Sequence, residues 1–169
     1  MKNLWDSYRA EQKAYKAQVH LQTGQEVSVE FVLPPEFFGR ITVSDVGEFR
    51  PEIWKSDCLE VFLFFADGSY REWNLATDLA WWSKGFASYR KVIDASSEQA
   101  HKPKGVTLDP KSHKISWYFD CGRAVSEIKH WRACVIDKKI PEPHLLSSDK
   151  LAAEGRDFHL FSKLSLIHI

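Results

Sequence analysis

Cysteine is scarce in this chain, and its few copies show no pairing or metal-binding pattern. The 169 residues include three cysteines, Cys58, Cys121 and Cys134, an odd number with no Cys-x-x-Cys motif. A disulfide framework or a zinc site is therefore not expected, and free thiols in a reducing compartment are the simplest interpretation. On this ground we expect a cytoplasmic location.

Methionine and paired histidines are lacking as well. Met1 is the only methionine, which argues against a haem held by Met and His. The seven histidines show no His-x-His or His-x-x-x-His spacing, so no transition-metal site is predicted. We expect no cofactor, except that a structural calcium ion remains open, which would need clustered oxygen ligands. The candidates for such a cluster, by proximity alone, are Asp45, Glu48, Glu52 and Asp57.

Net charge and long apolar runs are also absent. Lys plus Arg and Asp plus Glu number 23 each, so no field steers phosphate groups and nucleic acid is not an expected partner. No run approaches the roughly 18 apolar residues of a membrane span, and the N-terminal residues contain no signal-peptide core. We predict one domain over residues 1–169, with 44% hydrophobic residues available for its core.

Aromatic residues, in contrast, are abundant. They make up 14% of the chain and include seven tryptophans. Large rings beyond the needs of a core often lie at binding surfaces, because they bury much area at a low entropic cost.

The apolar residues repeat with a period of two, which is typical of half-buried strands. In residues 26–33, Val27, Val29, Phe31 and Leu33 alternate with polar positions. The full set of predicted strands is 16–22, 26–33, 40–44, 57–65, 69–75, 114–121, 131–137 and 161–169.

Turn residues define how these strands connect. Asp67-Gly68 between two strand patterns predicts a tight hairpin. Helix is scarce, with a short turn possible at 123–130 and a short helix at 147–154. The pattern predicts an all-β fold, an antiparallel β-sandwich of jelly-roll or immunoglobulin-like type with at most one or two short helices.

Two adjacent predicted strands carry polar side chains among aromatic ones. Alternation places Glu60 on one face with Phe62, and Tyr70, Glu72 and Asn74 together on a face of the partner strand. A carboxylate among phenylalanines is costly unless it is paired. Sugars suit such a mixture, because their C–H faces pack on rings and their hydroxyls need donors and acceptors.

The ordered pattern Trp-x-x-Asp-Cys-x-Glu-x-Phe, then Tyr-x-Glu-x-Asn, then Trp and Tyr-Arg resembles the DOMON-like superfamily. It is most similar to the bacterial group related to family 9 carbohydrate-binding modules. The matching residues are Trp54, Asp57, Cys58, Glu60, Phe62, Tyr70, Glu72, Asn74, Trp81, Phe86, Tyr89 and Arg90, and residues 156–159 resemble that group's Pro-Asp-Phe-His stretch. The resemblance implies a sandwich in which two rings hold a terminal saccharide, with Trp54 as one ring, Phe158 or His159 as the other, and Glu60 accepting from hydroxyls.

The leading hypothesis is therefore a non-catalytic module that binds a saccharide or polyol. Its predicted ligand-binding residues are Trp54, Glu60, Asn74, Trp81, Arg90, Phe158 and His159, supported by Asp57, Tyr70, Glu72 and Tyr89.

Two alternatives remain open. A structural or protein-interaction domain of the same fold, with a possible protein partner or homo-oligomer, would use Glu60 in a buried ion pair with Arg90 or Arg71. A glycoside-active enzyme would use Glu60 and Glu72 as an acid/base pair, which needs carboxyl groups about 5–10 Å apart.

Overall fold

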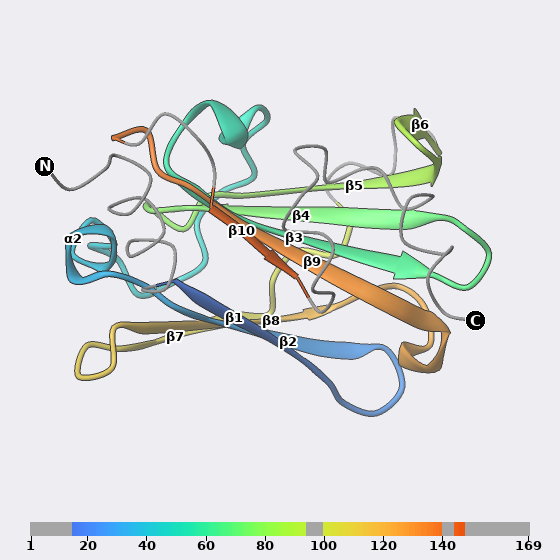
Figure 1. Cartoon of the computed structure of the whole chain (residues 1–169), viewed down its shortest axis with the longest axis horizontal. Helices are drawn as coiled ribbons and strands as arrows, with labels where there is room; N and C mark the ends of the chain where they lie inside the picture. The colour runs from blue at the N-terminus through green and yellow to red at the C-terminus, as the bar shows by residue number, and fades with distance from the viewer. Residues whose placement is uncertain (1–14, 94–99, 140–143, 148–169) are drawn as a thin grey trace, which may run out of the picture.

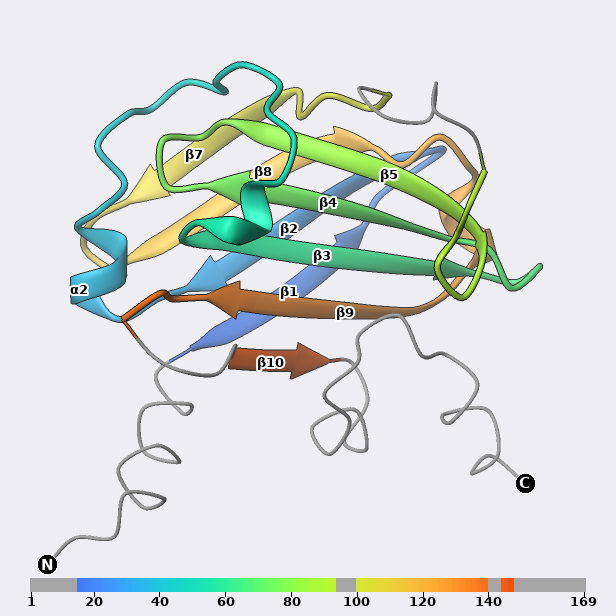
Figure 2. The same ribbon diagram turned by 90° about the horizontal axis from the view of Figure 1, so that it is seen from above.

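The computed structural model of the protein describes residues 15–93 and 100–139, and the backbone of residues 144–147. Its ten strands form two antiparallel sheets that pack face to face (Figure 1). Seen from above, the strands of the two sheets cross at an oblique angle (Figure 2), as expected when two twisted sheets pack. The predicted antiparallel β-sandwich is confirmed. No helix in the described ranges is long and apolar enough to cross a membrane.

The smaller sheet has the strand order β1-β2-β8-β7. Its strands are β1 (Lys16–Leu21), β2 (Glu26–Val32), β8 (Lys114–Asp120) and β7 (Gly105–Asp109). The predicted alternation holds in β2, where Val27, Val29 and Phe31 are buried against the other sheet. β7 was not predicted.

The larger sheet has the order β10-β9-β3-β4-β5-β6. Its strands are β10 (His144–Ser147), β9 (Ile128–Ile136), β3 (Cys58–Phe65), β4 (Tyr70–Ala76), β5 (Trp81–Ser88) and β6 (Lys91–Val92). The predicted hairpin joins β3 and β4. Gly68 adopts a φ of 84° in its turn, and the Asp67 carboxylate accepts from the backbone N–H and hydroxyl of Ser69 at 3.0 and 2.6 Å.

Helix is as scarce as predicted, with one α-helix and two 3-10 turns in the described ranges. They are α2 (Pro35–Phe38), η1 (Ile53–Lys55) and η3 (Val125–Glu127), the last lying inside the turn expected at 123–130.

Two local predictions were wrong. Residues 40–44 form no strand, because the N–H groups of Arg40 and Ile41 bond to the carbonyls of Phe37 and Phe38 and prolong the turn of α2. Ser147 ends β10 and does not begin a helix, because its backbone pairs with Arg132 of β9. The rest of that expected helix, 148–154, and the expected strand 161–169 lie outside the described residues.

The core fills the space between the sheets. Trp73 of β4 and Phe119 of β8 meet there with their ring centroids 4.4 Å apart. Alternate residues of β3, from Leu59 to Phe65, also point into this core. The remaining side chains of β3 are buried too, so they must be covered on the face that points away from the smaller sheet.

Candidate functional site

Buried polar side chains occupy this outer face of the larger sheet. Glu60 and Glu72 are each 6% exposed, Arg132 is 4% exposed and Asn74 is fully buried. Charged side chains are rarely buried so completely unless they are paired. We call these four residues the outer-face cluster.

The strand register places one row of the cluster across four strands. Glu60 of β3 lies opposite Asn74 of β4 on one side and Cys134 of β9 on the other. Asn74 in turn lies opposite Trp82 of β5. A thiol, a carboxyl, an amide and an indole therefore follow one another across the sheet.

A second row lies two residues along each strand. Phe62 of β3 separates Glu72 of β4 from Arg132 of β9, and Lys84 of β5 faces Glu72 from the other side. Glu60 and Glu72 are therefore diagonal neighbours on paired strands, with acidic, amide and basic groups all facing the same way.

An aromatic stack closes the cluster toward the β3–β4 turn. The Tyr70 ring stacks on Phe64 and Phe86, with centroid distances of 5.2 and 4.6 Å. The guanidinium of Arg132 lies over the Phe64 ring at 5.1 Å. The Tyr70 hydroxyl accepts a hydrogen bond from the backbone N–H of Arg90 at 3.1 Å, so Tyr70 also fixes the turn that carries Arg90.

The two carboxyl groups favour their protonated forms. Burial raises the pKa of Glu60 to about 7, while the Cys134 thiol and the charge of Lys138 act in the opposite direction. Burial, and after it the negative charge of Glu60, raises the pKa of Glu72 well above its usual range. Near neutral pH the pair therefore holds less than its full negative charge.

The neighbouring thiols favour their protonated forms. Burial, together with the charge of Glu60, raises the pKa of both Cys58 and Cys134 well above the usual range of a thiol. The Cys58 Sγ lies 4.0 Å from Oε1 of Glu60. A nucleophilic or metal-binding thiolate is disfavoured in such a site. All three cysteines are unpaired and buried.

Asn74 is the least satisfied polar residue of the cluster. Neither its amide nitrogen nor its amide oxygen makes a hydrogen bond of ordinary geometry within the described part of the chain. The amide lies near enough to Glu72 to favour the ionised form of that carboxyl, but the contact lacks the geometry of a hydrogen bond. An unpaired buried polar group costs about 1–3 kcal/mol, so this amide calls for an explanation.

Two tryptophans border the cluster at its far end. Trp54 of η1 is 37% exposed and meets Trp82 edge to face, with ring centroids 5.0 Å apart. Lys84 Nζ lies over the Trp82 ring at 5.8 Å. The predicted Trp81 does not join them, because it points to the opposite face and packs against Phe49 at 5.4 Å in the core.

Asp57 has a structural role at the start of β3. Its carboxylate accepts from Arg40 Nη1 at 2.6 Å and from the backbone N–H of Lys138 at 2.7 Å. Asp57 therefore holds the start of β3 in place and does not face the cluster.

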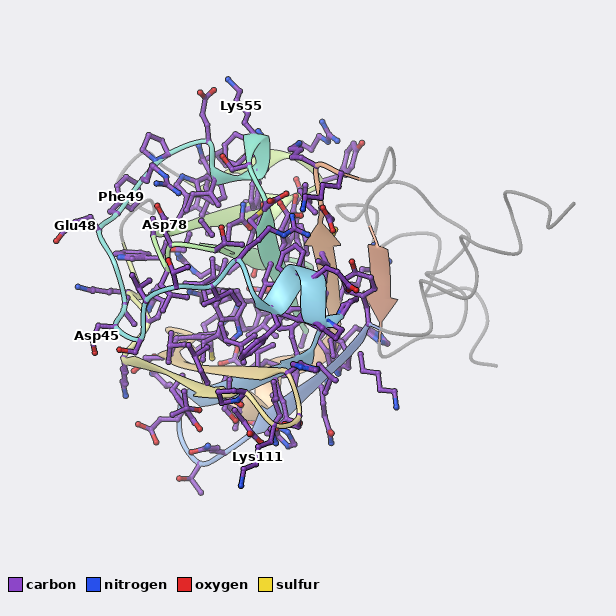
Figure 3. The ribbon with its side chains drawn as sticks, turned by 90° about the vertical axis from the view of Figure 1, so that its left-hand side faces the viewer. Asp45, Glu48, Phe49, Lys55, Asp78 and Lys111 are labelled. Carbon is purple, nitrogen blue, oxygen red and sulfur yellow. The ribbon has the colours of Figure 1, made fainter. Side chains whose placement is uncertain are left out.

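The acidic residues considered for calcium do not gather. Asp57 is bound to Arg40 and Glu52 pairs with Lys55 at 2.7 Å, while Asp45 and Glu48 point outward at separate places (Figure 3). In residues 15–93 and 100–139, no group of three or more His, Cys, Asp or Glu side chains is placed to hold a metal ion.

The remaining predicted residues fall in two places. Tyr89 and Arg90 lie in the turn between β5 and β6, where Tyr89 is 49% exposed and the charge of Arg90 acts on Glu72. Glu60 forms no ion pair with Arg90 or Arg71 among the described residues. Phe158 and His159 lie outside the described residues.

Sequence reasoning missed four residues of this face: Trp82, Lys84, Arg132 and Cys134. The signal that could have found two of them is the run Arg132-Ala-Cys134-Val, where polar and small apolar residues alternate as they do in β3. Trp82 and Lys84 lie in β5, and the sequence of that strand shows no alternation of apolar and polar residues that would have predicted it.

Comparison with known proteins gives this chain no relative. No family model matches it, and neither a curated protein nor a solved structure matches it. The resemblance to the DOMON-like superfamily and family 9 carbohydrate-binding modules therefore stays a prediction from the sequence.

Proposed function

We propose that the outer face of the larger sheet binds a saccharide or another polyol without cleaving it. The observation that carries this proposal is the Asn74 amide, which is buried beside two carboxyl groups without a hydrogen-bond partner of its own in the described chain. A polyol hydroxyl both donates and accepts, so a pair of hydroxyls would complete both ends of the amide.

The neighbouring groups supply the rest of such a site. Glu60 and Glu72 offer acceptors, and each in its protonated form offers one donor as well. Trp54, which is 37% exposed and packs against the buried Trp82, offers ring surface next to these groups, which suits the C–H face of a sugar. Small-molecule sites typically combine a small number of convergent polar groups with aromatic side chains.

The placement of the two carboxyl groups favours binding over cleavage. Glycoside hydrolysis needs two carboxyl groups on either side of the scissile bond. Glu60 and Glu72 project from one face of one sheet as diagonal neighbours, so both approach a ligand from the same side. Release of reducing sugar from an oligosaccharide, lost in Glu60→Gln, would contradict the non-catalytic part of this proposal.

Calorimetric titration with a panel of mono- and oligosaccharides and linear polyols tests the proposal. We expect binding that weakens about tenfold or more in Asn74→Leu and in Glu60→Gln, because each loses a buried hydrogen bond to the ligand. Asp45→Asn, which alters an exposed loop carboxyl, is the control and should bind as the unmodified protein does. If the folded protein binds no member of the panel, the saccharide proposal fails and the interaction-domain alternative takes its place.

A further inference from the structure

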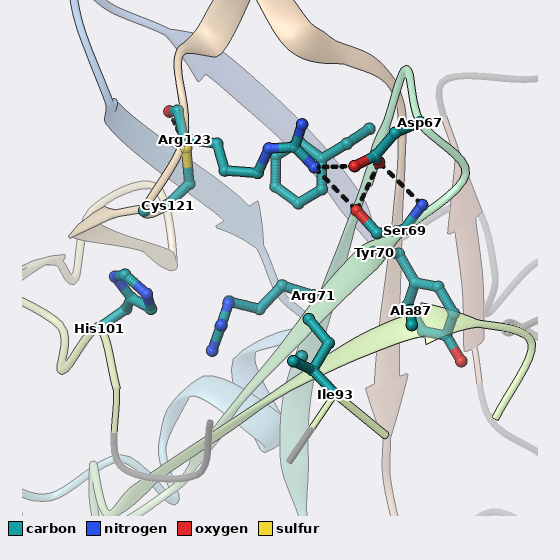
Figure 4. A pocket seen from close by; sticks show the side chains of 12 residues that line it. Asp67, Ser69, Tyr70, Arg71, Ala87, Ile93, His101, Cys121 and Arg123 are labelled. Carbon is teal, nitrogen blue, oxygen red and sulfur yellow. Dashed lines mark hydrogen bonds and ion pairs between the residues drawn. The ribbon is translucent and has the colours of Figure 1, made fainter. Parts of the chain in front are cut away.

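A pocket opens at one end of the sandwich, away from the outer-face cluster. It has a volume of about 370 Å³ and lies beside the β3–β4 turn (Figure 4). One side is formed by core-facing residues of the larger sheet, including Arg71 and Gly85, and the other by Cys121, Gly122 and Arg123 after β8. We call it the end pocket.

Among the described residues that line the end pocket, basic side chains outnumber acidic ones. Arg71, His101 and Arg123 line it, and Asp67 is the one carboxylate among the lining residues that the structure describes. Arg123 Nη1 binds Asp67 at 2.7 Å, and Arg123 also pairs with Glu127. These ion pairs hold Arg123 in place. Arg71 and His101 reach toward the pocket from opposite sides (Figure 4).

His101 is held in place by its backbone. It adopts a φ of 63°, an uncommon value for a residue with a side chain, and its carbonyl accepts from the Trp73 indole at 3.2 Å. The preceding carbonyl, of Ala100, accepts from the Ser83 hydroxyl. Two hydrogen bonds from the core therefore fix the backbone that presents the imidazole, and such fixed, strained residues are frequent at functional sites.

Two glycines make room for these side chains. A Cβ atom on Gly122 would lie 2.3 Å from the His101 ring, and one on Gly85 would lie 2.9 Å from Arg71 Nη2. The imidazole and the guanidinium thus rest against bare backbone on opposite walls. A side chain at either glycine would displace them.

We propose that the end pocket binds a small oxyanion, the phosphate or carboxylate group of a small molecule, between Arg71 and His101. The fork of a guanidinium matches both kinds of oxyanion, and its five N–H donors allow an anion to share it with other acceptors. An imidazole N–H supplies a second donor from the facing wall. This site is independent of the function proposed for the outer face.

The charges around His101 fit this assignment. Burial and the positive charge of Arg71 lower the pKa of His101, and Asp120 acts in the opposite direction. The other ionisable groups among the described residues that line the pocket are Asp67, Tyr70, Arg123 and Cys121. An anion between Arg71 and His101 would offset their repulsion and raise the pKa of the imidazole, so binding should take up protons near neutral pH.

NMR titration of the His101 ring signals tests the proposal. Inorganic phosphate and acetate are added separately at constant ionic strength, and the pKa of His101 is measured with and without each anion. We expect saturable shifts with at least one anion, a rise in the pKa of His101, and binding about tenfold weaker in Arg71→Met. The anion that saturates identifies the phosphate or the carboxylate as the recognised group.

Matched variants separate a site from a general salt effect. Lys111→Met removes a charge from the exposed turn between β7 and β8 and should leave the titration unchanged. Arg71→Lys keeps the charge without the fork, and it replaces Arg71→Met if that variant does not fold. Absence of saturation with both anions, or equal weakening in the Arg71 variant and Lys111→Met, would overturn the proposal.

Discussion

Arg40 binds Asp137 through both terminal nitrogens of its guanidinium group, with N–O distances of 3.0 Å from Nη1 and 2.6 Å from Nη2. Nη1 also donates to Asp57 at 2.6 Å. The Asp137 side chain is 6% exposed and that of Arg40 is 19% exposed, so these charges are largely removed from water. The interaction joins the turn after α2 to the start of β3 and the end of β9.

Arg40→Met should destabilise the protein by about 2–3 kcal/mol, because it removes the guanidinium group that pairs with the buried Asp137 carboxylate. The measurement is urea unfolding followed by tryptophan fluorescence. Arg50→Met is the control, since Arg50 and Asp78 also form a two-nitrogen pair but are 44% and 54% exposed. Loss of that solvated pair should cost less than about 1 kcal/mol, and equal costs for the two variants would contradict the expectation.

Glu60→Gln should change how stability depends on pH. A pKa raised from 4.5 to about 7 means that the folded state binds a proton more tightly than the unfolded state. The contribution of Glu60 is therefore fully present below pH 4.5 and is lost as the pH rises through about 7. The advantage of the glutamine variant should grow by about 3 kcal/mol across this window and then level off.

Urea unfolding at a series of pH values measures this difference. Glu48→Gln serves as its control, because Glu48 is exposed and its replacement removes no buried carboxyl. A difference between Glu60→Gln and the unmodified protein that stays flat from pH 4.5 to 7 would show that burial does not raise this pKa.

Asn74→Leu should raise stability by about 1 kcal/mol while it weakens polyol binding about tenfold or more. The substitution replaces an amide that lacks a hydrogen-bond partner among the described residues with an apolar group of similar size. Ser83→Ala is the contrast, because the buried Ser83 hydroxyl donates to the Ala100 carbonyl. That change should cost about 1–2 kcal/mol. Thermal unfolding compares them, and a large loss of stability in Asn74→Leu would reveal a structural role for the amide.

Gly122→Ala should destabilise the protein by about 2–4 kcal/mol and displace His101. The new methyl group would collide with the imidazole, and the φ of 76° would be strained in addition. Gly24→Ala isolates the backbone part, since Gly24 has a φ of 69° but no atom within 4 Å of a Cβ. It should cost about 1 kcal/mol. Equal costs in chemical denaturation would mean that the His101 ring moves aside freely.

The sequence predicted the β3–β4 hairpin because its information is local. Asp67-Gly68 specifies the turn, and the alternation on each side specifies which residues share a face. Glu60, Glu72, Asn74 and Tyr70 were grouped correctly for this reason.

β5 escaped prediction because both of its faces are covered. Trp81 lies in the core and Trp82 on the outer face, so the run shows no alternation between apolar and polar residues. Which of the two rings borders the cluster depends on the register with β4, which the sequence of β5 does not reveal.

Arg132 and Cys134 were missed for a different reason. They reach the cluster through pairing of β9 with β3, and the two strands are far apart in the chain. The end pocket depends on the meeting of two sheets in the same way, since His101 and Gly122 approach Arg71 and Gly85 only across the interior.

The pairing β2–β8 lies at the centre of the smaller sheet and β3–β9 lies inside the larger one, and each joins the first half of the chain to the second. Loops of this size close slowly, because much chain entropy is lost before the contacts form. The local hairpins can form early, but each sheet is complete only once its own distant pairing exists. We therefore expect slow folding on the scale of milliseconds to seconds, and no fragment that ends before β8 should retain either site.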